Sequence, residues 1–165
     1  MNNETLFSRI KFRPRDITRR IILHDSHTGP NVENITDYLR NKGRELGLMD
    51  VGYHAILDRD GTVTQTRDWT VWGSHTPGHN FDSIGLCLVG GAHMDGWLEG
   101  GAFTFDQRKA LFGVMNMLMR TWPDIKIIAH TEVQRFRKRE CSCPDLDIEQ
   151  LRDDFTMYRK YGIIP

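Results

Sequence analysis

Apolar residues are arranged along this chain in five short runs, separated by segments whose apolar positions recur every three or four residues. The runs predict β-strands at about 19–24, 52–58, 62–67, 83–89 and 125–130. Asp60-Gly61 separates the second run from the third, and because glycine readily adopts a positive φ, the pair predicts a tight hairpin. The pattern therefore indicates a sheet built from segments spread over most of the chain.

Three longer segments have the spacing of amphipathic helices. The first ends near Gly47, the second begins at Thr104 and reaches about Arg120, and the third covers about 146–158. Thr104 and Gln107 have capping-box spacing, in which the hydroxyl accepts a backbone N–H and the glutamine side chain reaches back. Helices interspersed among strands predict the α/β class, with a central mixed β-sheet flanked by helices. The expected buried stripes are Ile35, Leu39 and Leu46 with Tyr38 beside them, and Leu111, Met115, Leu118 and Trp122.

Size and composition predict one compact domain. A chain of 165 residues with 39% hydrophobic content can bury one sizeable core, so we expect residues 1–16 to form a polar N-terminal extension and residues 17–160 a single domain.

The 22 basic residues balance the 22 acidic ones, which gives no electrostatic reason to expect direct nucleic-acid or membrane binding. We expect a monomer. The first residues lack an apolar signal segment, so we expect synthesis in the cytoplasm without export.

Two histidines and one cysteine lie where the pattern can bring them to one point. His24 and His130 each end an apolar run, and Cys143 follows in a short polar loop. Two imidazoles and one thiolate suit zinc, and three protein ligands leave the last tetrahedral position for a water that the metal can acidify. The three residues therefore predict a zinc site of the hydrolytic kind.

The other two cysteines have different expected roles. Cys87 lies inside an apolar run, where a small buried hydrophobic residue is the expected interpretation. Cys141 stands two residues before Cys143, and two arrangements are open to it. In the one we favour, its side chain points away from the metal; in the other, it is a fourth ligand that closes a structural zinc site.

A wider set of residues resembles one enzyme family. In chain order its segments are Ile22-Leu23-His24, Asp50-Val51-Gly52-Tyr53-His54, Asp60-Gly61-Thr62-Val63, Gly73-Ser74-His75, Asn80 with Ser83-Ile84-Gly85, Ala129-His130 and Cys143-Pro144. Together these segments resemble the zinc-dependent N-acetylmuramoyl-L-alanine amidases of type 2, above all the small single-domain phage amidase endolysins; peptidoglycan recognition proteins share the fold. The resemblance spans about residues 20–155, and it identifies residues 17–160 as one zinc amidase domain.

The resemblance implies a substrate and a role for particular residues. It implies hydrolysis of the amide between N-acetylmuramic acid and the first L-alanine of the peptidoglycan stem, after release of the protein to the cell wall. It places the Zn²⁺ ligands on His24, His130 and Cys143, and the catalytic tyrosine on Tyr53. A tyrosine hydroxyl in this place can donate to the oxyanion of the transition state. The remaining implied roles are substrate contacts by His75 and Asn80, whereas the expected role of His54 is structural.

The chain departs from the family pattern at one position. Catalytic phage enzymes of this kind carry a lysine two residues before the ligand cysteine, and here that residue is Cys141. Proton delivery to the leaving nitrogen could then come from Tyr53, from the zinc-bound water or from a nearby cation such as Lys138 or Arg139. These cations belong to the basic segment 135–139, for which a solvated loop is the default interpretation. By resemblance alone, a phage RNA polymerase is a second partner to consider.

Two other classes of protein compete with the hydrolase interpretation. Some peptidoglycan recognition proteins bind without catalysis, but retention of all three ligands and Tyr53 favours an enzyme. A zinc deaminase would use the H-x-E spacing of His130 and Glu132, but a P-C-x-x-C pair should follow it and does not. The amidase interpretation therefore explains more of the residues than either rival.

Overall fold

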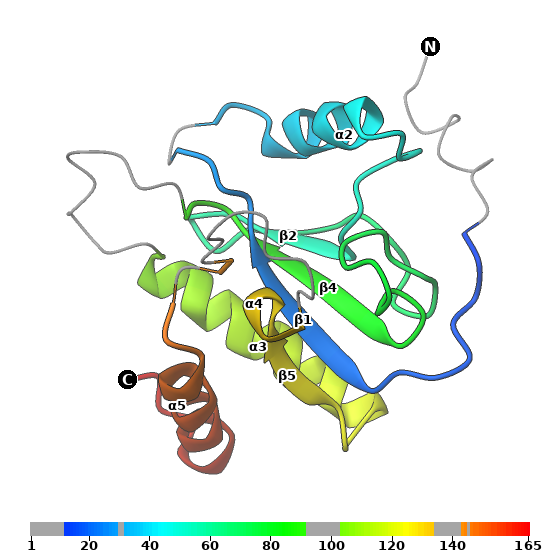
Figure 1. Ribbon diagram of the computed structural model, residues 1–165. Helices are drawn as coiled ribbons and strands as arrows, with labels where there is room; N and C mark the ends of the chain where they lie inside the picture. The colour runs from blue at the N-terminus through cyan, green and yellow to red at the C-terminus, as the bar shows by residue number, and fades with distance from the viewer. Residues whose placement is uncertain (1–11, 30–31, 92–102, 134–142, 145) are drawn as a thin grey trace.

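The protein is built around a twisted sheet with helices on both faces, as the computed structural model shows (Figure 1). The structure describes residues 12–29, 32–91, 103–133, 143–144 and 146–165. Within these residues five strands form one sheet in the order β3-β2-β4-β1-β5. The predicted α/β class with a mixed sheet is therefore confirmed, and none of the described helices is long and apolar enough to cross a membrane.

Four of the strands are parallel and the fifth closes one edge in the opposite direction. β4 lies between β1 and β2 and is parallel to both, β5 runs parallel to β1, and β3 pairs antiparallel with β2. The predicted hairpin is confirmed, with Gly61 at φ 85° in the turn, although its strands are shorter than the apolar runs. The strands are β1 (Arg20–Asp25), β2 (Ala55–Leu57), β3 (Val63–Gln65), β4 (Ser83–Leu88) and β5 (Lys126–Ala129).

One face of the sheet is covered by α3 (Phe105–Thr121) and α5 (Ile148–Tyr161). The capping box predicted at the start of α3 is present, since Thr104 Oγ1 accepts from the N–H of Gln107 and Gln107 Oε1 accepts from the N–H of Thr104. Of the predicted stripe, Leu111, Met115 and Leu118 are buried here, and Trp122 is partly buried. These side chains pack with alternate residues of β1, β2 and β4 and form the larger of two apolar clusters.

The opposite face carries α2 (Ile35–Glu45), which buries Ile35 and Leu39 as expected. Leu46 was expected in the same stripe, and this was wrong, because its side chain is 79% exposed. The helix ends at Glu45, and Gly47 turns the chain away with φ 81°. Tyr38 is exposed as well. The apolar cluster under α2 is the smaller of the two and includes Ile56 of β2 and Cys87 of β4.

Residues 12–16, which fall within the expected polar extension, are packed against the loop before β4. The buried guanidinium of Arg15 donates to the backbone oxygens of Val71 at 2.6 Å, Ser83 at 3.1 Å and Trp69. Burial lowers the pKa of Arg15 to about 10. Arginine at a chain start suggests a solvated leader, but here three carbonyl oxygens replace water around the charge.

His54 ties this region to the sheet from a fully buried position. Its Nδ1 accepts from the N–H of Gly85 at 3.0 Å, while Nε2 lies 2.9 Å from the carbonyl oxygen of Val71 and donates to it. Only the neutral ring with its proton on Nε2 can make both bonds. Burial lowers the pKa of His54 to about 4, and the structural role expected for this residue agrees with these contacts.

We expect the protein to lose stability in mild acid because of His54. Below about pH 6.5 the unfolded chain takes up a proton at this ring, whereas the folded chain does so only near pH 4. The contribution of the neutral His54 ring to the free energy of unfolding is therefore complete above pH 6.5. It is lost as the pH falls toward 4, and the total loss is about 3 kcal/mol. Urea unfolding at pH 7.5 and 4.5 should show a smaller difference between the two pH values for His54→Gln than for the wild type. Equal differences would contradict this account.

Candidate metal centre

His24 and His130 lie side by side at the carboxyl-end edge of the sheet. β1 and β5 are parallel neighbours in which Leu23 is opposite Ala129, and the residue that follows each of these two is one of the histidines. Their ring centroids are 4.5 Å apart. His24 still belongs to β1, whereas His130 opens the short helix α4 (His130–Val133) and does not end the strand as expected. The juxtaposition predicted from the two apolar runs is nevertheless present.

Cys143 brings the third donor to the same point. Its Sγ lies 4.0 Å from Nδ1 of His24 and accepts from the backbone N–H of Asp25 at 3.3 Å, while the N–H of Thr131 donates to its carbonyl oxygen at 3.1 Å. One ligand atom from each of His24, His130 and Cys143 lies within 4.8 Å of the others. Hydrogen bonds from both neighbouring segments therefore fix the position of this residue.

The donor set fits a zinc ion by its geometry and by its protonation. Nδ1 of His130 is buried and has no hydrogen-bond partner among the described residues, as expected for a nitrogen whose lone pair is reserved for a metal. Burial lowers the pKa of His24 well below its ordinary value, and His130 lowers it further; burial also lowers the pKa of His130. Both rings are therefore neutral at pH 7, which is the form that binds metal.

Tyr53 lies against His24 with ring centroids 5.1 Å apart. Burial raises the pKa of the Tyr53 hydroxyl well above its ordinary value, and Cys87, Cys143 and Asp25 raise it further. Cys87 is a buried residue that pairs with His24 across β1 and β4, which brings its thiol to the same site. Tyr53 thus stands beside the metal donors as a protonated, neutral hydrogen-bond donor. The place of Cys87 at this site was not expected from the sequence.

His75 and Asn80 also come to this site, but they make contacts within the protein. His75 lies edge-on to His24, with Nδ1 at 3.0 Å from Nε2 of His24. Burial lowers the pKa of His75 well below its ordinary value, with further lowering by the neighbouring histidines. Asn80 Oδ1 accepts from the backbone N–H groups of His75 and Thr76, both at 2.9 Å. The substrate contacts predicted for His75 and Asn80 stay predictions.

Comparison with known proteins decides the family. The N-acetylmuramoyl-L-alanine amidase family matches this chain over residues 13–145, which include all three metal donors, Tyr53, His75 and Asn80. The chain belongs to this amidase family. The endolysin of Enterobacteria phage K11 is 38% identical over 143 residues, which cover 87% of this chain and 91% of that protein. The family named from the sequence motifs is therefore confirmed.

Solved structures agree with the amidase fold. The Ph2119 endolysin from Thermus scotoductus MAT2119 bacteriophage Ph2119 has a TM-score of 0.73 at 20% identity and covers 92% of this chain and 94% of its own. Drosophila PGRP-LB has a TM-score of 0.64 at 21% identity, covering 81% and 79%. At these identities the similarity establishes the fold, including the expected relation to peptidoglycan recognition proteins.

Glu132 anchors the helical turn that carries His130 in this member of the amidase family. Its carboxylate accepts from the backbone N–H of Ala129 at 2.6 Å and from Arg152 of α5 at 2.8 Å. Arg152 also donates to the carbonyl oxygen of Ile127 on β5 at 2.7 Å. These contacts give the H-x-E spacing a structural explanation in place of the deaminase one. The sequence offered no signal for the partner, because Arg152 lies 20 residues away.

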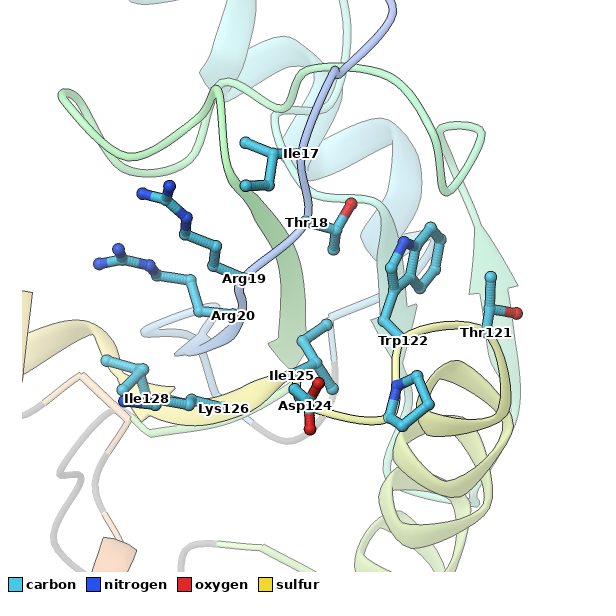
Figure 2. A pocket seen from close by; sticks show the side chains of 11 residues that line it. Ile17, Thr18, Arg19, Arg20, Thr121, Trp122, Asp124, Ile125, Lys126 and Ile128 are labelled. Carbon is cyan, nitrogen blue, oxygen red and sulfur yellow. The ribbon is translucent and has the colours of Figure 1, made fainter.

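Three residues were named as candidates for proton delivery or ligation: Cys141, Lys138 and Arg139. They lie outside the described residues, as does the whole basic segment 135–139. A pocket of about 570 Å³ elsewhere on the amidase is shown in Figure 2. It is lined by residues at the amino ends of β1 and β5, such as Arg20, Trp122 and Lys126. It therefore lies at the sheet edge opposite the metal donors and includes none of the predicted site residues.

Proposed function

We propose that this protein is a zinc-dependent hydrolase of peptidoglycan that cleaves the amide between N-acetylmuramic acid and L-alanine. The observation that carries the proposal is the convergence of the ligand atoms of His24, His130 and Cys143 within 4.8 Å, beside the ring of Tyr53. Membership of the amidase family and the similarity to a phage endolysin support the choice of bond and substrate. The three donors would hold Zn²⁺, with the fourth tetrahedral position open to water.

The residues around the donors prepare this site for an unactivated amide. Bound zinc supplies a water with a pKa lowered to about 7 and a Lewis acid for the substrate carbonyl. His24 and His130 are neutral, so no imidazole proton has to leave before the metal binds. The backbone N–H of Asp25 points at the sulfur of Cys143 and favours its thiolate form. The protein thus holds both imidazoles in the form that a metal needs, and it places a backbone donor at the sulfur of the third ligand.

Tyr53 supplies the stabilising hydrogen bond of the reaction. Its hydroxyl keeps its proton at neutral pH, because burial raises its pKa well above the ordinary value. The groups near it in the resting protein include the sulfur of Cys87, and sulfur is a weak acceptor. When negative charge develops on the substrate carbonyl oxygen, that oxygen is a much stronger acceptor for the same hydroxyl. The hydrogen bond therefore strengthens as the transition state forms, which is the condition for catalysis.

Digestion of purified peptidoglycan tests the proposal directly. We expect new L-alanine amino termini, detected by dansylation and chromatography, with no increase in reducing sugars. Chelation should stop their release, and stoichiometric zinc should restore it. New reducing ends without new amino termini would identify a glycosidase, and binding of peptidoglycan without either product would identify a recognition module.

The finer parts of the proposal concern localisation, oligomeric state and a second partner. We propose synthesis in the host cytoplasm and action on the wall after release, by a monomer. A second role as a partner of a phage RNA polymerase belongs to the same resemblance, and we assign no described surface to it.

A further inference from the structure

His24 presents its two ring nitrogens to different partners. Nδ1 faces the metal donors and lies 4.0 Å from Sγ of Cys143. Nε2 faces away from them and lies 3.0 Å from Nδ1 of His75 and 3.3 Å from Oγ1 of Thr76. His24 is only 2% exposed, so water has little access to compete for these contacts. The ring is therefore held from behind by side chains of the loop that precedes β4.

Once Nδ1 of His24 binds a metal, the hydrogen bonds on the Nε2 side of the ring have only one possible direction of donation. The proton of His24 must then be on Nε2, which becomes the donor. The Nε2–H of His24 can donate directly to Nδ1 of His75. It can instead donate to Oγ1 of Thr76, and the Thr76 hydroxyl, which lies 3.0 Å from Nδ1 of His75, then donates to that nitrogen. On either route Nδ1 of His75 is the acceptor.

The other ring nitrogen of His75, Nε2, continues the same series of donations. With Nδ1 accepting, the neutral His75 ring carries its proton on Nε2, which lies 3.5 Å from Oγ of Ser83. Ser83 donates its own hydroxyl proton to the carbonyl oxygen of His79 at 2.6 Å and so keeps lone pairs for His75. A continuous series of donations thus leads from His24 through His75 and Ser83 to the backbone.

The fold holds His75 in a slot made by two glycines. A Cβ atom on Gly85 would lie 2.5 Å from the ring of His75, and one on Gly73 would lie 2.4 Å from it. Gly85 is part of β4, whose other residues on this face have side chains. The backbone of His75 is fixed too, because its N–H donates to Asn80. Ring and backbone are both constrained, as a residue that orients another side chain needs to be.

We propose that His75 is a positioning residue for the metal ligand His24. Nδ1 of His75 accepts the hydrogen bond from the Nε2–H of His24, so that Nδ1 of His24 is kept free for zinc. Asn80 fixes the turn that carries His75. This inference rests on the proposed zinc function. It gives His75 and Asn80 a task that does not require contact with the substrate. Partners of this kind fix the ring orientation of a ligand and raise its basicity.

Zinc affinity of His75 variants tests the inference without reference to activity. His75→Leu removes the acceptor, and we expect its zinc affinity, measured by competition with a chromophoric chelator, to fall about 10- to 100-fold. His75→Asn places a carbonyl oxygen near the original Nδ1 and should recover most of the loss. His27→Asn is the matched control, because His27 is exposed and its positive φ of 50° suits asparagine. This control should bind zinc as the wild type does.

The outcomes separate this inference from the proposed function. Wild-type zinc affinity in His75→Leu would overturn the positioning role and leave the zinc hydrolase in place, whereas a wild-type protein that takes up no zinc would overturn both. A second measurement does not depend on folding of a variant. Nitrogen NMR of the zinc-loaded wild type should show His75 protonated on Nε2 and unprotonated on Nδ1. A proton on Nδ1 of His75 would refute the inference.

Discussion

Alanine in place of His130 is expected to remove both the zinc and the hydrolysis of peptidoglycan. Two remaining donors cannot hold the metal as three do, and without it neither an acidified water nor a Lewis acid is available. Since the loss of a single hydrogen-bond donor costs about 10²–10³ in turnover, loss of the metal should exceed about 10³-fold. His24→Ala and Cys143→Ala should behave alike. His130 is the sharpest choice, because it is less buried than the other two donors and its removal disturbs the core least.

Metal analysis and wall digestion check this expectation together. Cys87→Ala is the matched control for metal content, because Cys87 is a buried thiol outside the donor cluster. It should retain one zinc per chain. One zinc per chain and wild-type digestion in His130→Ala would contradict the ligand assignment.

Phenylalanine in place of Tyr53 is expected to lower turnover by about 10²–10³ while zinc content and folding stay intact. The ring that packs on His24 is kept, and only the hydroxyl is lost. Sulfur is a weak hydrogen-bond acceptor, so loss of the hydroxyl beside Cys87 should cost little stability in the resting protein. In the transition state the same change removes a donor to the oxyanion. The expected loss is therefore in kcat, with KM little changed.

Initial rates of alanine amino-terminus release, at several substrate concentrations, measure this effect. Zinc content and a thermal unfolding curve should accompany them, so that a metal-free or unfolded sample is recognised. Unchanged kcat in zinc-loaded Tyr53→Phe would show that Tyr53 is a packing residue.

Most of the fold and the metal donors could be predicted from local patterns in the sequence. β1 and β5 are short apolar runs, and parallel neighbours deliver the residues at their carboxyl ends to one edge, so His24 and His130 could be placed together. Burial of charge could not be predicted in this way. Arg15 was expected in a polar leader, since nothing local reveals the three carbonyl oxygens that surround it.

The contacts behind the metal donors could not be predicted because they depend on an irregular loop. The position of His75 against His24 comes from residues 66–82, where no period of two or of 3.6 fixes the direction of a side chain. One signal was nevertheless present. Gly85 interrupts a run of larger apolar residues in β4, and a glycine inside a strand often marks the close approach of another group. Here that group is the ring of His75.

The distance along the chain between the donors has a consequence for biosynthesis. His24 and Cys143 are 119 residues apart in sequence, and the strands that bring His24 beside His130 come from the two ends of the domain. A nascent chain on the ribosome holds one donor until residue 130 has been made, so it cannot assemble the centre. In the proposed zinc centre, metal capture by all three donors must therefore wait until residue 143 has been made, and a bound ion would then close a loop of more than one hundred residues. A product truncated before residue 130 therefore lacks two of the three donors of the proposed zinc centre.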